Sequence, residues 1–121
     1  MIMKPRPMMI VDSLWNTARK RMTPQEEALY NHWDDNVHAD DLLRDSGIVR
    51  VIRYRPLDGA GTLHIQEYES EAALESYLVS ERRKELIKET NGNYPAGNGP
   101  EYVFEKRTVR CFVPVSSKGR D

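Results

Sequence analysis

The stretch "IVRVIRYRPLDGAGTLHIQEY", residues 48–68, decides the predicted fold because it contains two strand patterns separated by one turn signal. Residues 48–55 are rich in β-branched side chains and stop at Pro56, whereas residues 62–68 alternate strictly between apolar and polar side chains. Between them, the Asp58–Gly61 segment has the composition of a tight turn. We therefore predict a β-hairpin here.

Strand and helix signals flank this hairpin on both sides. Residues 8–15 predict a first strand, and the Thr23–Glu26 segment has the hydroxyl, proline and glutamate of a helix start with a capping box. After the hairpin, Ser70 can cap a second helix, whose apolar stripe slips near Ser80 in a way that is consistent with a break. Residues 101–115 return to a strand pattern.

The resulting order, β-α-β-β-α-β, predicts a ferredoxin-like α+β fold with a four-stranded antiparallel sheet and two helices on one face. At 121 residues the chain has the length of one domain, with a core at about 8–113 and a polar tail at 114–121. Two helices cover only one face of a sheet, so the other face must meet water, a ligand cavity or a partner subunit.

The alternation in the last strand of the hairpin separates these two faces. Leu63 and Ile65 are the apolar set, which we expect to pack on the helices. His64, Gln66 and Tyr68 would then line the open face as a polar pocket. Because that face is also expected to carry Val49 and Val51, we predict that a second copy of the chain covers it, giving a homodimer.

Composition limits the partners. Eighteen Lys and Arg residues against nineteen Asp and Glu residues leave a net charge of −1, which argues against nucleic acid or an anionic membrane as the partner. Cys111 is the only cysteine, so neither an intrachain disulfide nor a cysteine zinc cage can form, and we expect a cytoplasmic protein with a buried structural thiol. No apolar run reaches the length of a membrane span.

The segment "YNHWDDNVH", residues 30–38, is the densest cluster of chemically active side chains. On a regular helix Trp33 shares a stripe with Leu29 and Val37, which predicts a role in the core. His32 and His38 are six residues apart, so one helix cannot direct both at a single ion, and the i,i+4 histidine pair of helical zinc sites is missing. We therefore predict no metal site.

The same segment contains a candidate acid/base pair. Asp34 and Asp35 precede His38 by four and three residues, within reach of its ring on a helix. The alternative is an exposed polar face, since His38 lies almost opposite the Trp33 stripe on a straight helix. On the next strand Arg50, Arg53, Arg55 and Tyr54 could hold an anionic or enolic oxygen, or the arginines could simply form surface ion pairs.

Several of these residues fall into a known pattern: Asn31, Trp33, Asp35 and His38, followed by Gly47-Ile48 and Arg53-Tyr54. The pattern, over roughly residues 8–112, resembles the EthD-like branch of the dimeric α+β barrel superfamily. The resemblance implies a homodimer whose subunits each enclose a cavity between sheet and helices, with His38 facing that cavity and Asp35 as the acidic residue before it. It fixes no single reaction.

Two features depart from the family pattern. Asp40 stands where the family has proline after the histidine, and the glycine-rich and asparagine-rich loop 91–100 has no counterpart. Tyr94 in that loop is either a lid residue over the cavity or part of an ordinary surface loop.

These observations favour a cofactor-independent enzyme, of the isomerase, cyclase or monooxygenase type, acting on an aromatic, polyketide-like or enolisable metabolite. His38 would be the general base, oriented by Asp35 or Asp34, and His64 with Tyr68 would donate to the oxyanion. The predicted substrate-binding residues are Trp33, Arg50, Arg53, Tyr54, Gln66 and Tyr68. The alternative is a non-catalytic dimeric protein that binds a hydrophobic metabolite, and a third possibility is haem binding, which needs only one histidine.

Overall fold

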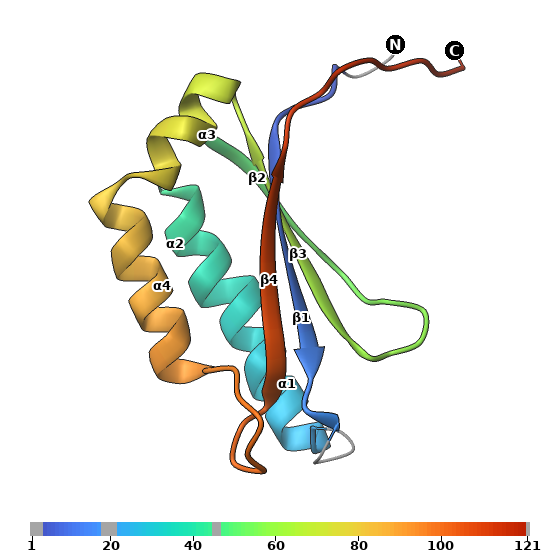
Figure 1. Ribbon diagram of the computed structural model, residues 1–121, viewed down its shortest axis with the longest axis vertical. Coiled ribbons are helices and arrows are strands. Elements are labelled where there is room, and N and C mark those ends of the chain that lie inside the picture. The colour runs from blue at the N-terminus through green and yellow to red at the C-terminus, as the bar shows by residue number, and fades with distance from the viewer. Residues whose placement is uncertain (1–3, 18–21, 45–46, 121) are drawn as a thin grey trace.

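The computed structural model describes residues 4–17, 22–44 and 47–120 and shows a sheet with helices packed on one side of it (Figure 1). The strands are β1 (Met8–Trp15), β2 (Ile48–Tyr54), β3 (Gly61–Tyr68) and β4 (Phe104–Phe112). All pairings are antiparallel, in the order β2-β3-β1-β4. The ferredoxin-like α+β fold is thereby confirmed, and Gly59 supplies the positive φ of 69° in the β2–β3 turn.

The helical layer consists of two segments. The first runs without interruption through α1 (Pro24–His32), η2 (Trp33–His38) and α2 (Ala39–Leu43), and the second is divided into α3 (Glu71–Leu78) and α4 (Glu81–Asn93). Thr23 forms the predicted capping box with Glu26. Ser80 accepts a hydrogen bond from the backbone N–H of Arg83, so the predicted break is real and each half has its own cap.

The first helical segment does not bury the stripe that the sequence predicts. Leu29 is 67% exposed and Val37 is 39% exposed, whereas Tyr30 and Asp34 are buried. The prediction of an apolar Leu29–Trp33–Val37 stripe was therefore wrong. The sheet offers Asp34 two partners on its inner side, Arg53 and His64, which compensate the cost of burying a carboxylate.

The two faces of β3 are also the reverse of the prediction. Tyr68 belongs to the core with residues of α3 and α4, and His64 and Gln66 are buried on the same, helix-covered face. Leu63 and Ile65 are partly exposed on the open face. Alternation separated the two sets correctly, but the polar set packs inside because it finds hydrogen-bond partners there.

The core between sheet and helices is made of residues from both layers: Met9, Leu42, Ile48, Tyr68, Leu74, Tyr77 and Leu86. Val51 packs against this core and so does not lie on the open face, contrary to the prediction, while Val49 is exposed beside an irregularity in the β2–β3 pairing. None of the helices in the described ranges is long and apolar enough to cross a membrane.

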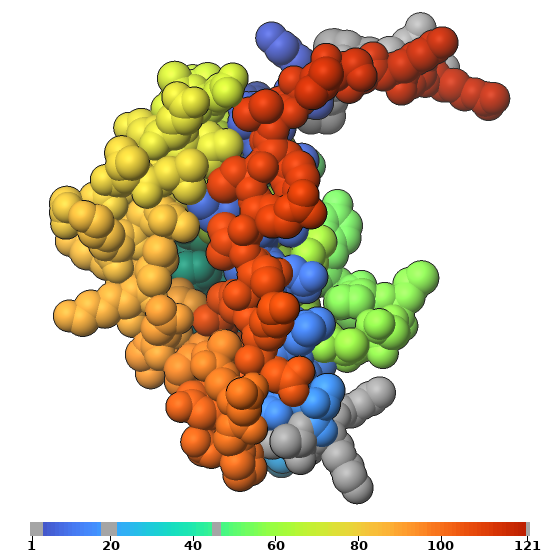
Figure 2. Space-filling model, in the orientation of Figure 1, coloured from blue at the N-terminus to red at the C-terminus, as the bar shows by residue number. Residues whose placement is uncertain are grey.

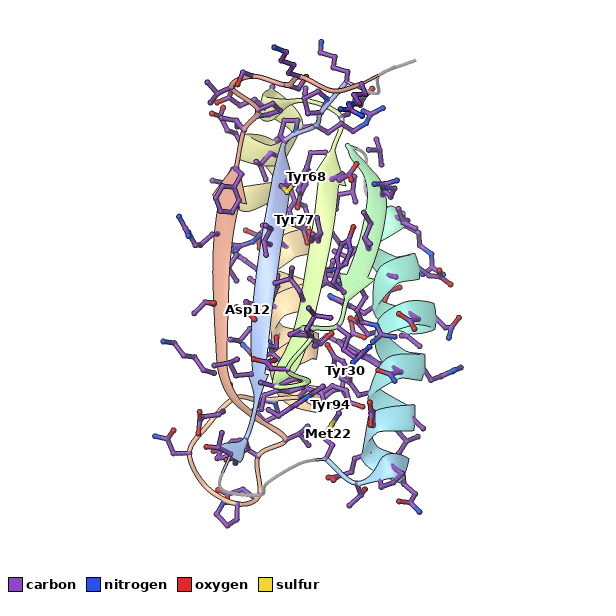
Figure 3. The ribbon with its side chains drawn as sticks, turned by 90° about the vertical axis from the view of Figure 1, so that its right-hand side faces the viewer. Asp12, Met22, Tyr30, Tyr68, Tyr77 and Tyr94 are labelled. Carbon is purple, nitrogen blue, oxygen red and sulfur yellow. The ribbon has the colours of Figure 1, made fainter. Side chains whose placement is uncertain are left out.

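The open face of the sheet, which Figure 3 views directly, is apolar at its centre. Ile10 and Ile52 are both paired with Ile65, so three isoleucines lie side by side across three strands, all partly exposed. The space-filling view shows this side of the molecule as concave, with the red segment that follows β4 extending past the sheet (Figure 2).

Candidate active site

A π-helical turn positions the histidine that the sequence singled out. The backbone N–H of Ala39 bonds to the carbonyl of Asp34, five residues earlier, so the η2 segment holds more residues per turn than an α-helix. Residues five apart then lie one above the other. The rings of Trp33 and His38 stack with centroids 4.8 Å apart and planes inclined by 10°. His38 therefore turns inward, whereas α-helical spacing places it nearly opposite Trp33.

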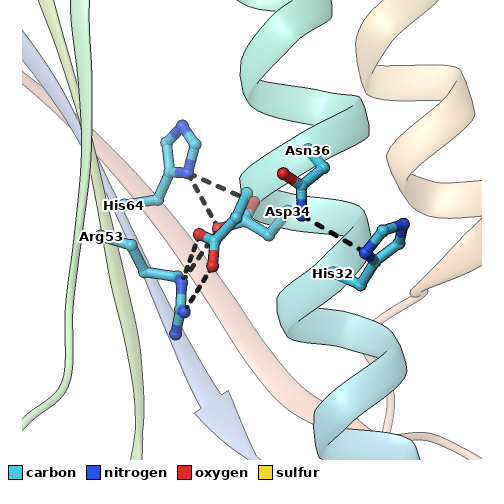
Figure 4. Close-up of polar contacts among 6 residues, drawn as sticks. His32, Asp34, Asn36, Arg53 and His64 are labelled. Atoms are coloured by element: carbon cyan, nitrogen blue, oxygen red, sulfur yellow. Dashed lines mark hydrogen bonds and ion pairs between the residues drawn. The ribbon is translucent and has the colours of Figure 1, made fainter.

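His38 lies beside a second buried histidine. The ring centroids of His38 and His64 are 5.5 Å apart, and His64 Nδ1 is 3.4 Å from both carboxylate oxygens of Asp34 (Figure 4). Within the described part of the chain, His38 Nδ1 and His64 Nε2 are buried and have no hydrogen-bond partner. Buried polar atoms are usually satisfied, so these two nitrogens mark a site with unused hydrogen-bonding capacity.

The protonation of His38 follows from these surroundings. Burial, followed by the neighbouring His64, lowers the pKa of His38 to about 4, and Asp34 and Asp41 oppose this change only in part. His38 is consequently neutral at physiological pH and has a lone pair available to accept a proton.

Asp35 does not contact His38, contrary to the prediction of an Asp35–His38 pair. Its two carboxylate oxygens accept hydrogen bonds from Arg53, Oδ1 from Nε at 3.0 Å and Oδ2 from Nη2 at 2.9 Å. This bidentate contact holds the pKa of Asp35 below its usual value. The histidine in contact with a carboxylate is His64, and that carboxylate belongs to Asp34. Arg53 Nε also lies 3.7 Å from Asp34 Oδ2.

A largely apolar cavity lies between the sheet and α4 and has a volume of about 470 Å³. Figure 2 shows a hollow between α4 (orange) and β4 (red) at this place. Its polar lining residues are His38, Gln66, Tyr77, Arg83, Thr90, Asn91 and Arg107, and its apolar ones include Met9, Val11, Leu42, Leu86 and Val109. Its size is typical of small-molecule sites.

Arg107 is a lining residue that the sequence analysis missed. Its Nε donates to Ser13 Oγ at 3.3 Å, its Nη2 to the carbonyl of Tyr94 at 2.9 Å, and its Nη1 to Asn91 Oδ1 at 3.4 Å. Burial lowers the pKa of its guanidinium below the ordinary value, although the group stays charged at neutral pH. Its position within an alternating strand gave no sign of burial, since the contacts come from β1 and α4 and from the residue that follows α4.

The other predicted site residues are scattered. Gln66 lines the cavity, but it also accepts a hydrogen bond of 2.7 Å from the hydroxyl of Tyr68, which is fully buried in the core. Arg50 pairs with Glu67 on the exposed sheet surface, and Tyr54 is 52% exposed. Arg50, Tyr54 and Tyr68 therefore do not line the cavity. Arg53 does not line it either, because its guanidinium is bonded to Asp35.

Trp33 belongs to an aromatic cluster. It packs against Tyr30 and Tyr94, with ring centroids 6.2 Å and 5.2 Å away, and Tyr94 also meets Tyr30 edge to face at 4.9 Å. Tyr94 is thus a packing residue rather than a lid. The following loop is tied down by the buried side chain of Asn16, which donates to the carbonyls of Gly99 and Tyr102.

Two further expectations can be compared with the structure. Cys111 is exposed, so the prediction of a buried structural thiol was wrong: β4 is an edge strand, and its end is not covered. Among the described residues, no three side chains of His, Cys, Asp or Glu gather as ligands of a metal ion would.

The sequence matches no protein-family model and no curated protein. Solved structures do share the fold. The monooxygenase from the gene ActVA-Orf6 of Streptomyces coelicolor, in complex with nanaomycin D, is 13% identical over 97% of this chain and 94% of its own, with a TM-score of 0.61. The hydroxynitrile lyase from Passiflora edulis is 12% identical over 95% and 98% of the two chains, with a TM-score of 0.59.

SnoaB, a cofactor-independent oxygenase from Streptomyces nogalater, is similar to the same extent: 13% identity over 93% of this chain and 96% of its own, with a TM-score of 0.55. Identities this low establish the architecture and leave the chemistry open. The likeness shows the shared fold alone, and the resemblance to the EthD-like branch of the dimeric α+β barrel superfamily is not confirmed and stays a prediction.

Proposed function

We propose that this protein is a small-molecule enzyme in which His38 acts as a general base without a bound cofactor. The observation that carries the proposal is the place of His38: a neutral imidazole at the wall of an apolar cavity, with a buried histidine and carboxylate behind it. Active sites are where burial and neighbouring charges shift pKa values in this way. The fold shared with cofactor-independent oxygenases and a hydroxynitrile lyase adds support.

The proposed step is the removal of a proton next to a carbonyl, or from a phenol. The proton moves to the imidazole of His38, and the electron pair of the broken bond becomes an enolate or phenolate oxygen. Gln66, which also lines the cavity, would stabilise that oxygen. This assignment replaces His64 and Tyr68, which do not line the cavity, as oxyanion donors.

Asp34 and His64 would serve as positioning residues. The carboxylate fixes which nitrogen of His64 carries a proton, and the ring of His64 stands beside that of His38. The developing negative charge of the substrate would favour the imidazolium form of His38 and raise its low pKa during the step. A base that is weak in the empty cavity would thus become stronger when the substrate ionises.

We also propose that the protein works as a homodimer. The three adjacent isoleucines of the open face are partly exposed, and apolar patches rimmed by polar side chains commonly mark interfaces. A second copy packed sheet to sheet would cover them. Sedimentation velocity at micromolar concentration tests this proposal: a dimer supports it, and a monomer contradicts it.

The catalytic proposal can be tested without knowing the natural substrate. Enolisable aromatic ketones and naphthols are incubated with the protein in D₂O, and deuterium incorporation is followed by NMR. We expect His38→Phe to slow protein-catalysed exchange by about 10²- to 10⁴-fold. His32→Gln is the matched control, since His32 is exposed and meets only Asn36 among the hydrogen bonds of the described residues.

The alternative function is a non-catalytic protein that binds a hydrophobic metabolite. The pKa of about 4 favours it, since a resting imidazole of such low basicity is a poor acceptor. Compounds that bind in the cavity but exchange no faster than in buffer would select this alternative and overturn the catalytic role of His38.

A further inference from the structure

Arg107 carries a half-buried positive charge that forms no ion pair among the described residues. Its three hydrogen bonds go to a hydroxyl, a side-chain amide oxygen and a backbone carbonyl, all of them neutral. The ring of Phe104 lies 5.1 Å from the guanidinium carbon and adds only a weak attraction. Buried charges in proteins are normally paired, because removing a charge from water is costly.

The walls of the cavity reinforce this excess of positive charge. Among the described residues that line it there are two arginines, Arg83 and Arg107, and no aspartate or glutamate. Asp34 lies behind the histidines and is already engaged by His64 and Arg53. The cavity therefore has an arginine near each end of α4, and aliphatic side chains line most of the rest.

We propose that the ligand of this cavity is an apolar molecule with one carboxylate, which Arg107 binds. The inference rests on the proposed function for the identity of the site, and it adds the class of substrate. A guanidinium has five N–H groups. Three are used by protein acceptors, so one on each terminal nitrogen remains, and this is the number that a carboxylate accepts side by side.

A single carboxylate fits better than a phosphate. A phosphate would bring about two charges and additional acceptor oxygens, which the aliphatic walls of Met9, Val11 and Leu86 could not satisfy. The volume of about 470 Å³ accommodates a bicyclic aromatic body beside the charged group. The ligand would thus lie with its carboxylate at Arg107 and its apolar body against the aliphatic walls.

The test compares 2-naphthoate with the neutral 2-naphthalenemethanol, using calorimetric titration and ¹³C-methyl NMR of the methionines. We expect the carboxylate to bind at least about tenfold more tightly than the alcohol. It should shift the methyl signal of Met9, which lines the cavity, and leave that of Met8, on the open face of the sheet, unchanged. Equal affinities, or no binding of naphthoate, would overturn the proposal.

Two variants test the role of Arg107 itself. Arg107→Gln should abolish the preference for the carboxylate without weakening the binding of the alcohol, and Arg107→Lys should restore part of it. Arg50→Gln is the matched control, because Arg50 is exposed and paired with Glu67. If Arg107→Gln does not fold, the affinities of the two ligands for the unaltered protein and for Arg107→Lys still test whether Arg107 binds the carboxylate.

Failure of this proposal can be told apart from failure of the catalytic one. His38→Phe should keep the preference for naphthoate while losing proton exchange, since the carboxylate is held by Arg107. If the protein exchanges protons on neutral ketones but binds naphthoate no better than the alcohol, the catalytic proposal stands. The proposal that the substrate is a carboxylic acid is then wrong.

Discussion

Replacing His38 with phenylalanine should change how stability depends on pH. Phenylalanine can keep the ring stacked on Trp33, where the centroids are 4.8 Å apart, but it has nothing to titrate. In the unfolded chain the pKa of a histidine is about 6.5, and in the folded protein that of His38 is about 4. Between pH 4 and pH 6.5, position 38 is therefore protonated in the unfolded state and neutral in the folded state.

The sign and size of the effect follow from linkage. Because the folded pKa is depressed, the free energy of unfolding is highest above pH 6.5 and falls as the pH is lowered toward 4. A difference of about 2.5 pKa units at about 1.4 kcal/mol each corresponds to roughly 3 kcal/mol for this one group. That amount is a substantial fraction of the stability of a small domain.

The measurement is urea unfolding at pH 7 and at pH 4 on three proteins. The unaltered chain and His32→Gln should lose this contribution on acidification, whereas His38→Phe should lose about 3 kcal/mol less. An NMR titration of the His38 ring should give a midpoint near pH 4. Identical pH dependence in His38→Phe and the unaltered protein, or a midpoint near 6.5, would refute the inward, desolvated placement of His38.

Three other perturbations test the site and the surface. Deleting Asn36 should convert the π-helical turn into a regular helix in which Trp33 and His38 are four residues apart, so His38 should keep its inward place and its low pKa in an NMR titration. Asp34→Asn should lower the free energy of unfolding by about 1–3 kcal/mol in urea, because it weakens a buried hydrogen bond with His64. Ile65→Lys, on the open face, should give a monomer in sedimentation at concentrations where the unaltered chain is a dimer.

The order of helices and strands was predictable because its signals are local. The capping box at Thr23, the hydroxyl caps at Ser70 and Ser80, and the turn at Asp58–Gly61 each depend on residues within four positions of one another. Such signals define where helices and strands begin and end, and the resulting order of helices and strands is compatible with only a few topologies.

The orientation of the sheet was not predictable in the same way. Alternation assigns Leu63 and Ile65 to one face and His64 and Gln66 to the other, but it does not say which face the helices cover. The usual rule places the apolar set inside. Here the rule fails because His64 and Gln66 find hydrogen-bond partners on the inner face, while the apolar set lies on the face that we propose a second copy covers.

Only some of the residues that line the cavity could be predicted from the sequence. His38 and Gln66 were named from the sequence and both line the cavity. Arg107 was not, because its burial depends on contacts with Ser13 and Asn91, which are 94 and 16 residues away. Arginines were predicted to hold an anionic oxygen, but the predicted ones follow or lie on β2, where Arg50 and Arg53 form ion pairs, whereas Arg107 on β4 and Arg83 on α4 line the cavity.

The direction of His38 depends on a single feature that residue spacing cannot reveal. In an α-helix Asp34 and His38 share one side because they are four residues apart, and Trp33 and His38 do not. The π-helical turn adds stacking between Trp33 and His38 while it keeps Asp34 turned toward His64. Both ring and carboxylate thus reach the inner face of β3. Since π-helical turns are rare and are frequently found at functional sites, the turn supports the proposal that His38 serves the chemistry of the cavity.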